Sequence, residues 1–421
     1  MKIYIRYLTS ILVAIAAFLP ETVKAQIQAV GTPPQPTATG TQNDALAAMD
    51  SVEISLLTCS PGEQIWSLYG HTAIRFVDKL HQTDLAINYG LFDYSQKYFY
   101  LRFTFGRTDY QMGIEPMDLF LEEYTDSGRG VIQQTLNLSR EEKMAIAQAL
   151  SENYTPINRV YRYNYFYDNC TTRARDIITN HLNGKVEYVD NAKVSPTWRQ
   201  LVHQWNDGHP WMKFGCDLLL GVGADRKTDF AQQQFIPDTL RKDFDKALVV
   251  EPSGHKHKLV ASTDYILRPD PSRVKASKNI WDTVTPRVFF ALLLVITLAI
   301  SAIDYRRKKT TWLFDTVLLT LNGLAGIILF AMIFSYHPTV RVNLQILLLN
   351  PLSLCFVYSV TRSSMKTRFS KYWNILMACT ILFAIGGIFQ DYAEGMYLLA
   401  CSLFIRFAVN RTLYYNKQKG K

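Results

Sequence analysis

The sequence predicts an α+β exported domain followed by an all-α transmembrane bundle. A short apolar stretch with a basic start opens the chain, and five longer apolar segments fill its last third. Between them lies a region of mixed composition in which β-prone runs and helical patterns both occur. With 421 residues, the chain is long enough for two or three domains.

The first 25 residues are typical of an export signal. Lys2 and Arg6 precede the apolar core "LTSILVAIAAFL", and "VKA" before Gln26 fits a small-residue cleavage site. Retention as an uncleaved anchor stays open, although the apolar core is shorter than the ~20 residues that span a bilayer. Residues 26–50 are rich in Pro, Thr, Gln and Gly and predict a disordered leader. We expect the folded exported domain over residues 51–280.

The composition changes near Val288, where the apolar segments begin. We therefore expect a transmembrane region of about five helices over residues 288–409 and a tail over 410–421. Asp315 interrupts the second segment, so the number of helices is open by one. The segments cover residues 288–303, 312–335, 342–360, 373–389 and 393–409.

Basic residues between these segments predict the orientation. "DYRRKKT", "TRSSMKTRFSKY" and "NRTLYYNKQKGK" hold four Lys or Arg each, whereas "SYHPTVR" and "QDYAE" hold one between them. The positive-inside rule puts the three basic pieces and the C-terminus in the cytoplasm, and the domain before Val288 outside it. These pieces also account for the net charge of +9, so nucleic acid is not expected as a partner.

Local patterns predict several elements of the exported domain. "HTAIRFVD" and "DLAINYGLF" predict an antiparallel strand pair, and "YFYLRFTFG" over residues 98–106 predicts a further strand. "SREEKMAIAQALSEN" has a capping box, Ser139 with Glu142, and predicts a helix. "SPTWRQLVHQW" predicts another helix, capped by Ser195.

The stretch "YNYFYDNCTTRARD" sets Cys170 in the first turn of a predicted helix, after Asp168 or Asn169 as N-cap and ending at Asn183-Gly184. The partial positive charge at a helix N-terminus stabilises a thiolate, and its N–H groups can hold an oxyanion. Cys170 is therefore a candidate nucleophile, with a buried packing thiol as the alternative.

A nucleophilic cysteine needs a base, and Gly70-His71-Thr72 offers one at the start of a predicted strand. Asn88, in the next strand, could bond the second imidazole nitrogen and set its tautomer. His81 is a rival for that role, but the pattern puts it in the hairpin loop.

Other chemistries fit the sequence less well. The chain has no Cys-x-x-Cys or His-x-x-x-His spacing, and "HKH" at 255–257 is expected to be a solvated loop. No serine elbow or glycine-rich phosphate loop is present, so we expect neither a metal centre nor a cofactor. In an oxidising compartment, a Cys59–Cys216 bridge is possible and would leave Cys170 free.

The set "YGHTAIRF", "AINYGLFDY", "YNYFYDNCTTRARD", "FSYHPTVRVN" and "LLLNPLSL" resembles the Lnb family of bacterial lipoprotein N-acyltransferases. The histidine-before-cysteine order is also similar to that of circularly permuted papain-like (NlpC-type) enzymes and lecithin retinol acyltransferase. The resemblance implies a permuted papain-like exported domain in the periplasm, attached to a multi-pass region in the bacterial inner membrane.

Carried over to this chain, the resemblance makes Cys170 the nucleophile, His71 the base and Asn88 the orienting residue. Residues that share the family's motifs but have only a supporting or unknown role are Asp168, Thr171, Thr172, Arg173, Asp176, His337 and Asn350.

The implied reaction moves an acyl chain from a membrane phospholipid, through a Cys170 thioester, to the α-amino group of a diacylated lipoprotein's N-terminal cysteine. Two alternatives remain: a membrane-tethered cysteine peptidase or amidase acting on cell-wall peptide, and an exported sensor without catalysis. The sequence leaves the oligomeric state, the phospholipid class and the lipoproteins served open.

Overall fold

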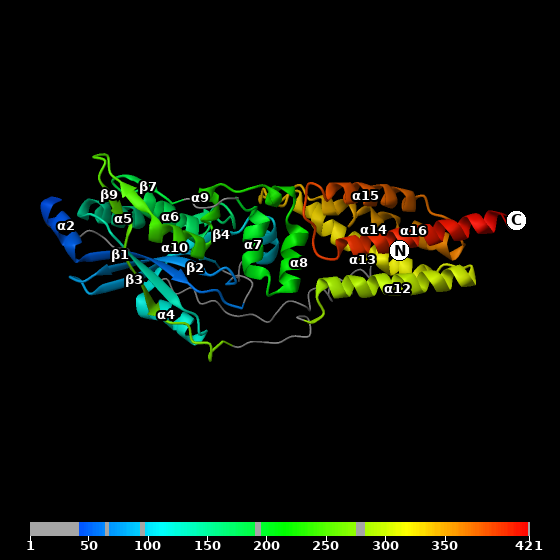
Figure 1. The fold of residues 1–421 in the computed structure, drawn as a ribbon, viewed down its shortest axis with the longest axis horizontal. Coiled ribbons are helices and arrows are strands. Elements are labelled where there is room, and N and C mark those ends of the chain that lie inside the picture. The colour runs from blue at the N-terminus through cyan, green and yellow to red at the C-terminus, as the bar shows by residue number, and fades with distance from the viewer. Residues whose placement is uncertain (1–41, 64–66, 93–96, 190–194, 275–282, 420–421) are drawn as a thin grey trace.

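A computed structural model describes residues 42–63, 67–92, 97–189, 195–274 and 283–419. The predicted export signal and most of the predicted leader lie outside the described residues. The α+β class of the N-terminal domain and the helical bundle after it are confirmed (Figure 1).

A seven-stranded antiparallel sheet forms the centre of the N-terminal domain, with strand order β10-β5-β1-β2-β3-β4-β6. Its strands are β1 (Val52–Cys59), β2 (His71–Asp78), β3 (Thr83–Leu91), β4 (Asp109–Pro116), β5 (Val131–Leu136), β6 (Val160–Arg162) and β10 (Val260–Leu267). A second sheet, in the order β7-β8-β9, contains β7 (Lys185–Glu187), β8 (Leu248–Val250) and β9 (Lys256–Lys258). The predicted β2–β3 hairpin is confirmed, with Ala73 opposite Asn88.

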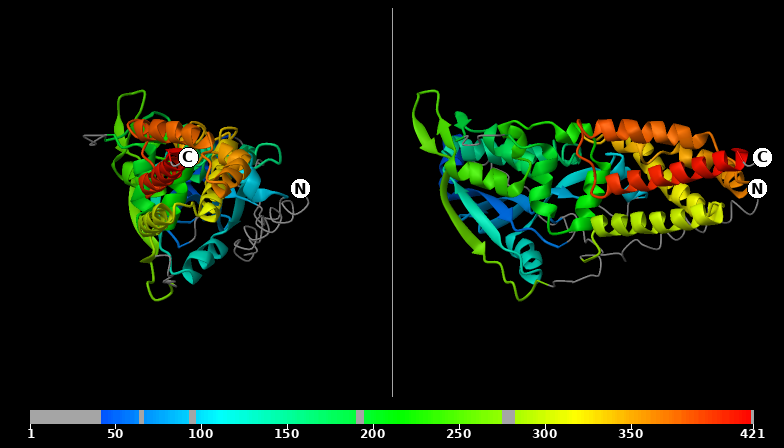
Figure 2. Two further views of the ribbon diagram at one scale, coloured as in Figure 1. Left: turned by 90° about the vertical axis from the view of Figure 1, so that its right-hand side faces the viewer. Right: turned by 45° about the vertical axis from the view of Figure 1, so that its right-hand side comes forward.

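Helices cover both faces of the large sheet. Successive strand residues point to opposite faces, so Leu56 packs with α5, α6 and α10 while Leu57 packs with α4. Figures 1 and 2 show α4 on the side of the sheet away from the other three helices. The helices of this domain are α2 (Gln42–Ala48), η1 (Met49–Ser51), α3 (Phe99–Thr104), α4 (Met117–Asp126), α5 (Arg140–Asn153), α6 (Cys170–Thr179), α7 (Trp198–Asn206), α8 (Pro210–Leu219), η2 (Val222–Asp225), α9 (Phe230–Gln233) and α10 (Pro237–Lys246).

The strand predicted over residues 98–106 is wrong. This segment forms helix α3, with Arg102 N–H donating to the Tyr98 carbonyl and Phe105 N–H to that of Leu101. The edge of β3 that a further strand would need is occupied by β4. Tertiary pairing therefore overrides the β-propensity of an aromatic run.

Two predicted helix boundaries and the predicted leader need smaller corrections. Helix α7 is capped by Thr197 instead of Ser195, because Thr197 and Gln200 form a reciprocal capping box directly after Pro196. Helix α6 ends at Thr179, before the predicted Asn183-Gly184 stop. The predicted leader is partly folded, since α2 lies inside residues 26–50. The Ser139–Glu142 capping box of α5 is confirmed.

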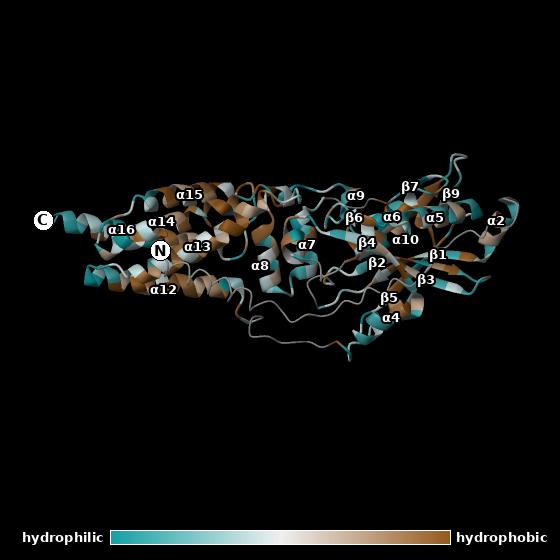
Figure 3. Cartoon of the chain, turned by 180° about the vertical axis from the view of Figure 1, so that it is seen from behind, coloured by the Kyte–Doolittle hydropathy of each residue, from teal (hydrophilic) through white to brown (hydrophobic). Residues whose placement is uncertain are grey.

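The C-terminal region consists of helices rich in apolar residues (Figure 3), many of which are exposed, for example Leu292, Val295 and Ile328. Among the described residues, four spans are long and apolar enough to cross a membrane, and α15 is a shorter apolar helix. The helices are α12 (Pro286–Arg307), α13 (Trp312–Met332), η3 (Leu344–Leu347), α14 (Leu352–Met365), α15 (Tyr372–Gly386) and α16 (Met396–Lys419). Asp315 does not break its helix, because the buried Arg406 bonds both Asp315 and Asp304, at 2.6 and 2.8 Å.

Polar contacts join the N-terminal domain to the bundle through α7, α8 and η2. The buried Arg199 bonds Asp217 and Asp225, at 2.7 and 2.6 Å, and Gln345 of η3 donates to the Asp217 carbonyl. Gly221 N–H donates to a carbonyl of the loop after α13, and a Cβ at Gly221 would collide with that loop. The two regions therefore pack as one body, with the domain fixed over one end of the bundle.

Candidate active site

The candidate nucleophile Cys170 is the first residue of α6, as predicted. Asn169 is the N-cap: its side-chain oxygen accepts from the N–H groups of Thr171 and Thr172, both at 2.9 Å. Its amide group donates to the carbonyls of Tyr165 and Phe235, so this cap is itself held on both sides. Because Asn169 already occupies the N–H groups of Thr171 and Thr172, these two groups are not free to hold an oxyanion.

The candidate base His71 is the first residue of β2. Gly70, just before it, has φ +77°, and a Cβ there would lie 2.6 Å from the Cys59 carbonyl oxygen. Only glycine therefore allows the chain to turn into β2 at this point. Thr72, the next residue, lies with its Oγ1 3.1 Å from that of Thr171, which fixes β2 against α6.

Asn88 of β3, the candidate orienting residue, forms a hydrogen bond with the imidazole of His71. Nε2 of His71 donates to Oδ1 of Asn88 over 2.8 Å, and the amide nitrogen of Asn88 donates to Oε1 of Glu115 over 2.5 Å. A carboxylate accepts hydrogen bonds and does not donate them, so Glu115 holds the N–H₂ end of the Asn88 amide. The oxygen of the amide therefore faces His71. This leaves Nδ1 of His71 directed toward Cys170.

The cysteine and the histidine interact directly. Burial raises the pKa of the Cys170 thiol, but the charge of His71 and its hydrogen bond outweigh burial and lower this pKa to about 7. Burial lowers the pKa of His71, while the charge and hydrogen bond of Cys170, and then the bond to Asn88, produce a net increase. The arrangement therefore favours a thiolate–imidazolium pair near neutral pH.

Glu115, which sequence reasoning missed, is the fourth member of this chain of hydrogen bonds. It is partly buried on β4, and burial raises the pKa of its carboxyl group. No local motif marks it, because the sheet register alone brings β4 beside β3. A search for acidic residues on the strand that pairs with Asn88 could have found it.

The supporting residues predicted beside Cys170 mainly build the local structure. Arg173 makes a two-pronged ion pair with Asp168, at 2.6 and 2.8 Å, and its guanidinium lies over the Tyr161 ring at 3.6 Å. Thr171 is buried against β2, and Asp176 pairs with Arg175. A role for any of them in substrate binding stays a prediction.

The two predicted residues of the C-terminal region occupy different places. His337, in the loop after α13, lies with Nε2 3.3 Å from the Phe103 carbonyl of α3 and beside Gly106, so it contacts the N-terminal domain. Burial lowers the pKa of His337. Asn350 is buried in the bundle, where its side chain accepts from the Leu352 N–H and its N–H donates to Asn322.

The structure bears on the predicted Cys59–Cys216 bridge and on His81 as the rival orienting residue. All six cysteines are free, which disagrees with a Cys59–Cys216 bridge: Cys59 is buried against α4, and burial raises the pKa of its thiol to about 12. His81 lies in the β2–β3 turn, as predicted, where it bonds Asp78 at 2.6 Å. That turn is at the other end of β2 from His71, so His81 is not the orienting residue.

Comparison with known proteins agrees with this division of the chain. Residues 41–204 match a family model described as the Lnb N-terminal periplasmic domain, and residues 277–418 match one described as the Lnb transmembrane domain. Searches of curated proteins and of solved structures gave no match. The chain therefore belongs to the Lnb family, as a membrane protein with an exported N-terminal domain.

Proposed function

We propose that this protein is a thiol-dependent acyltransferase that moves a fatty acyl chain from a membrane phospholipid to the α-amino group of a diacylated lipoprotein's N-terminal cysteine. The observation that carries the proposal is the Cys170–His71–Asn88 cluster at the end of the sheet nearest the transmembrane bundle.

The strand directions establish which end of the sheet holds the cluster. β2 begins at His71, and β3 runs antiparallel to it and ends at Leu91, so both strands bring the cluster to one end. The chain then continues to α3, and directly after this helix the Phe105 carbonyl accepts from the N–H of Tyr336 in the loop that follows α13. Figure 1 agrees, with α2 at the opposite end of the domain from the bundle. A nucleophile on this side suits a lipid-anchored substrate.

In the first half-reaction, the Cys170 thiolate attacks the ester carbonyl of a phospholipid. The tetrahedral intermediate collapses as the carbon–oxygen bond to glycerol breaks, and the imidazolium of His71 protonates the leaving oxygen. A lysophospholipid departs and an acyl thioester remains on Cys170. A neutral His71 then remains, ready to accept a proton.

In the second half-reaction, the lipoprotein's α-amino group attacks the thioester. His71 takes a proton from this amine, the carbon–sulfur bond breaks, and the acyl chain forms an amide. Cys170 is released as thiolate beside the imidazolium, so no net proton or electron is consumed. Asn88 keeps Nδ1 of His71 directed at the sulfur through both steps.

Aromatic side chains beside the cluster supply apolar surroundings for an acyl chain. The rings of Phe92 and Tyr110 stack at 4.8 Å, and those of Tyr110 and Tyr163 at 4.1 Å. A Cβ at Gly90 would lie 3.8 Å from the Cβ of Cys170 and 4.0 Å from the Tyr110 ring, so this stack borders the nucleophile. Apolar surroundings favour an acyl chain as the substrate over a peptide bound in a water-filled groove.

Helix α3 supports access from the bilayer. Tyr98, Leu101 and Phe103 are exposed on this helix, with exposed fractions of 66%, 57% and 40%, next to the loop that follows α13. Figure 2 shows this light-blue part of the chain reaching the end of the bundle in its right-hand view. Exposed apolar side chains beside membrane helices fit the headgroup boundary of a bilayer.

The proposed location is the bacterial inner membrane, with the N-terminal domain in the periplasm and the C-terminus in the cytoplasm. The support is the distribution of Lys and Arg between the helices described above. With this orientation, the phospholipid and the lipoprotein both reach Cys170 from the periplasmic leaflet.

The proposal is tested by trapping the thioester. Purified full-length protein is mixed with vesicles whose phospholipid carries a labelled acyl chain, and the protein is then precipitated and treated with hydroxylamine. We expect hydroxylamine-sensitive label on the protein, absent from Cys170→Ala. Absence of label from a folded, lipid-bound wild-type protein would contradict acyl transfer. Cleavage of cell-wall peptide by the same preparation would instead support the peptidase alternative.

A further inference from the structure

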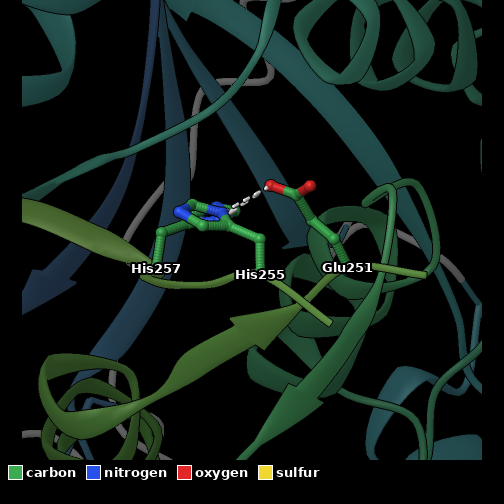
Figure 4. Close-up of side chains that lie close together, drawn as sticks. All are labelled: Glu251, His255 and His257. Atoms are coloured by element: carbon green, nitrogen blue, oxygen red, sulfur yellow. Dashed lines mark hydrogen bonds and ion pairs between the residues drawn. The ribbon is translucent and has the colours of Figure 1, made fainter. Parts of the chain in front are cut away.

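A second group of chemically active side chains lies far from Cys170. Glu251, His255 and His257 come from the hairpin that joins β8 to β9, and Figure 4 shows the two imidazoles close together beside the carboxylate. The sequence predicted a solvated loop over residues 255–257, but Lys256–Lys258 form strand β9, paired with β8. In Figure 1, β9 lies at the end of the domain away from the bundle.

The spacing of the three ligand atoms fits one metal ion. Nδ1 of His255 lies 3.1 Å from Oε1 of Glu251, and Nδ1 of His257 lies 3.5 Å from the same oxygen. All three ligand atoms are within 4.8 Å of one another. Ligands at ~2.0–2.1 Å from a tetrahedral Zn²⁺ are ~3.3 Å apart, so small rotations of the side chains would close the set around an ion.

Hydrogen bonds within the hairpin hold these side chains in position before any ion binds. Glu251 N–H donates to the His255 carbonyl, and Gly254, with φ +85°, makes the turn between them. Ser253 donates to Oε2 of Glu251, which leaves Oε1 facing the histidines.

The nearest lysines do not oppose a cation. Side chains alternate along a strand, so Lys256 and Lys258 point away from the face that carries His257. Lys256 is engaged with Glu187 of β7, at 2.6 Å. The three side chains supply one carboxylate oxygen and two imidazole nitrogens, which are ligand types that suit a divalent transition-metal ion.

We propose that Glu251, His255 and His257 bind one divalent transition-metal ion of the Zn²⁺ class, separate from the Cys170 cluster. Two imidazoles and one carboxylate are a common protein ligand set for zinc, and water completes the coordination. The bound ion connects both strands of the β8–β9 hairpin and stabilises the folded domain, because the paired hairpin of the folded chain holds the three ligands close together.

The test is calorimetric titration of the full-length protein with ZnCl₂ alone, in detergent. The protein carries no histidine tag, is treated with chelator and then dialysed. It also carries Cys170→Ala, because a thiolate beside an imidazole can itself bind zinc. Glu251→Gln and His257→Ala test the ligands, and His81→Ala is the matched control, since His81 is also exposed beside a single carboxylate.

We expect one ion per chain and a rise in Tm with zinc. Glu251→Gln should weaken binding about 10- to 100-fold, His257→Ala should abolish both the binding and the rise in Tm, and His81→Ala should change neither. An unchanged Tm of each variant without metal shows that it is folded. The proposal is overturned if the parent protein shows no saturable one-to-one binding, or if His257→Ala binds zinc as the parent does.

Discussion

Replacing Asn88 by alanine tests the role of the hydrogen-bonded cluster without any assumption about its substrate. Asn88 accepts a 2.8 Å hydrogen bond from Nε2 of His71, and it is buried, so water cannot easily replace it. A hydrogen bond to a charged group contributes ~1.5–3 kcal/mol. Nε2 also donates to Asn88 when the imidazole is neutral, and such a bond contributes ~0.5–1.5 kcal/mol. Losing Asn88 therefore raises the free energy of the thiolate–imidazolium pair, relative to the neutral thiol and imidazole, by the difference of ~1–1.5 kcal/mol.

The expected shift follows from this free energy. One pKa unit corresponds to ~1.4 kcal/mol, so the Cys170 pKa should rise by about 1 unit. From the wild-type value of about 7, the midpoint of thiolate formation should move to ~8. At neutral pH, the variant should therefore hold ~5-fold less thiolate.

The assay is the rate of iodoacetamide alkylation as a function of pH, with Cys170 followed by peptide mass spectrometry. Peptide mapping separates Cys170 from the other thiols, and burial raises the pKa of Cys59 to about 12, so Cys59 should stay unmodified. In the wild type, the rate should rise through about pH 7 as the thiolate forms. Asn137→Ala, which removes an exposed amide that bonds a backbone carbonyl, is the control and should not move the midpoint.

An alkylation midpoint for Asn88→Ala within ~0.3 unit of wild type, in a protein of unchanged Tm, would refute the reasoning, because 0.3 unit is ~0.4 kcal/mol. Such a result would mean that the amide does not stabilise the imidazolium. The base would then need another orienting group.

Three further results are expected. Glu115→Ala should slow alkylation of Cys170 at neutral pH about threefold, because Asn88 loses the hydrogen bond that holds it and the thiolate–imidazolium pair is destabilised by ~0.5–1 kcal/mol. An unchanged rate would show that Glu115 does not act on the cluster. Leu101→Glu should lower the rate of acyl transfer from phospholipid vesicles to Cys170 at least severalfold, because it puts a charge on the exposed apolar surface of α3. Leu80→Glu, at a similarly exposed leucine in the β2–β3 turn, should leave this rate unchanged, and equal effects of the two variants would contradict membrane contact by α3. Arg199→Ala should destabilise the protein by ~3 kcal/mol in thermal unfolding, because it removes the cation shared by the buried Asp217 and the partly buried Asp225 and leaves Asp217 only its bond to His203. Arg140→Ala, from an exposed ion pair, should leave Tm unchanged, and similar Tm values for the two variants would show that the Arg199 network is not needed.

The parts of the site predicted from the sequence are those with strong local signals. Cys170 follows a capping asparagine at a helix start, and His71 follows a glycine that the turn requires. Asn88 stands in the strand that a short hairpin pairs with β2. In each case, a few neighbouring residues determine the local backbone, whereas the packing of α6 against β2 that brings Cys170 to His71 is a long-range contact that no local pattern encodes.

The parts that were missed depend on tertiary structure. Glu115 reaches Asn88 only through the register between β3 and β4, which no local pattern encodes. The run from Tyr98 to Gly106 has strand composition but forms α3, because β4 occupies the neighbouring sheet edge. The histidines of the β8–β9 hairpin fell in a polar stretch whose pairing with β8 could not be seen from composition.

The most direct test of the proposed function is mass spectrometry of the N-terminal lipopeptide of a reporter lipoprotein. The reporter is made in bacteria that lack their own N-acyltransferase and receive either this protein or its Cys170→Ala variant at equal abundance. The account predicts a third acyl chain, on the α-amino group, with the intact protein and none with the variant. A reporter that stays diacylated with abundant, membrane-inserted wild-type protein, or that is triacylated equally by Cys170→Ala, would contradict it.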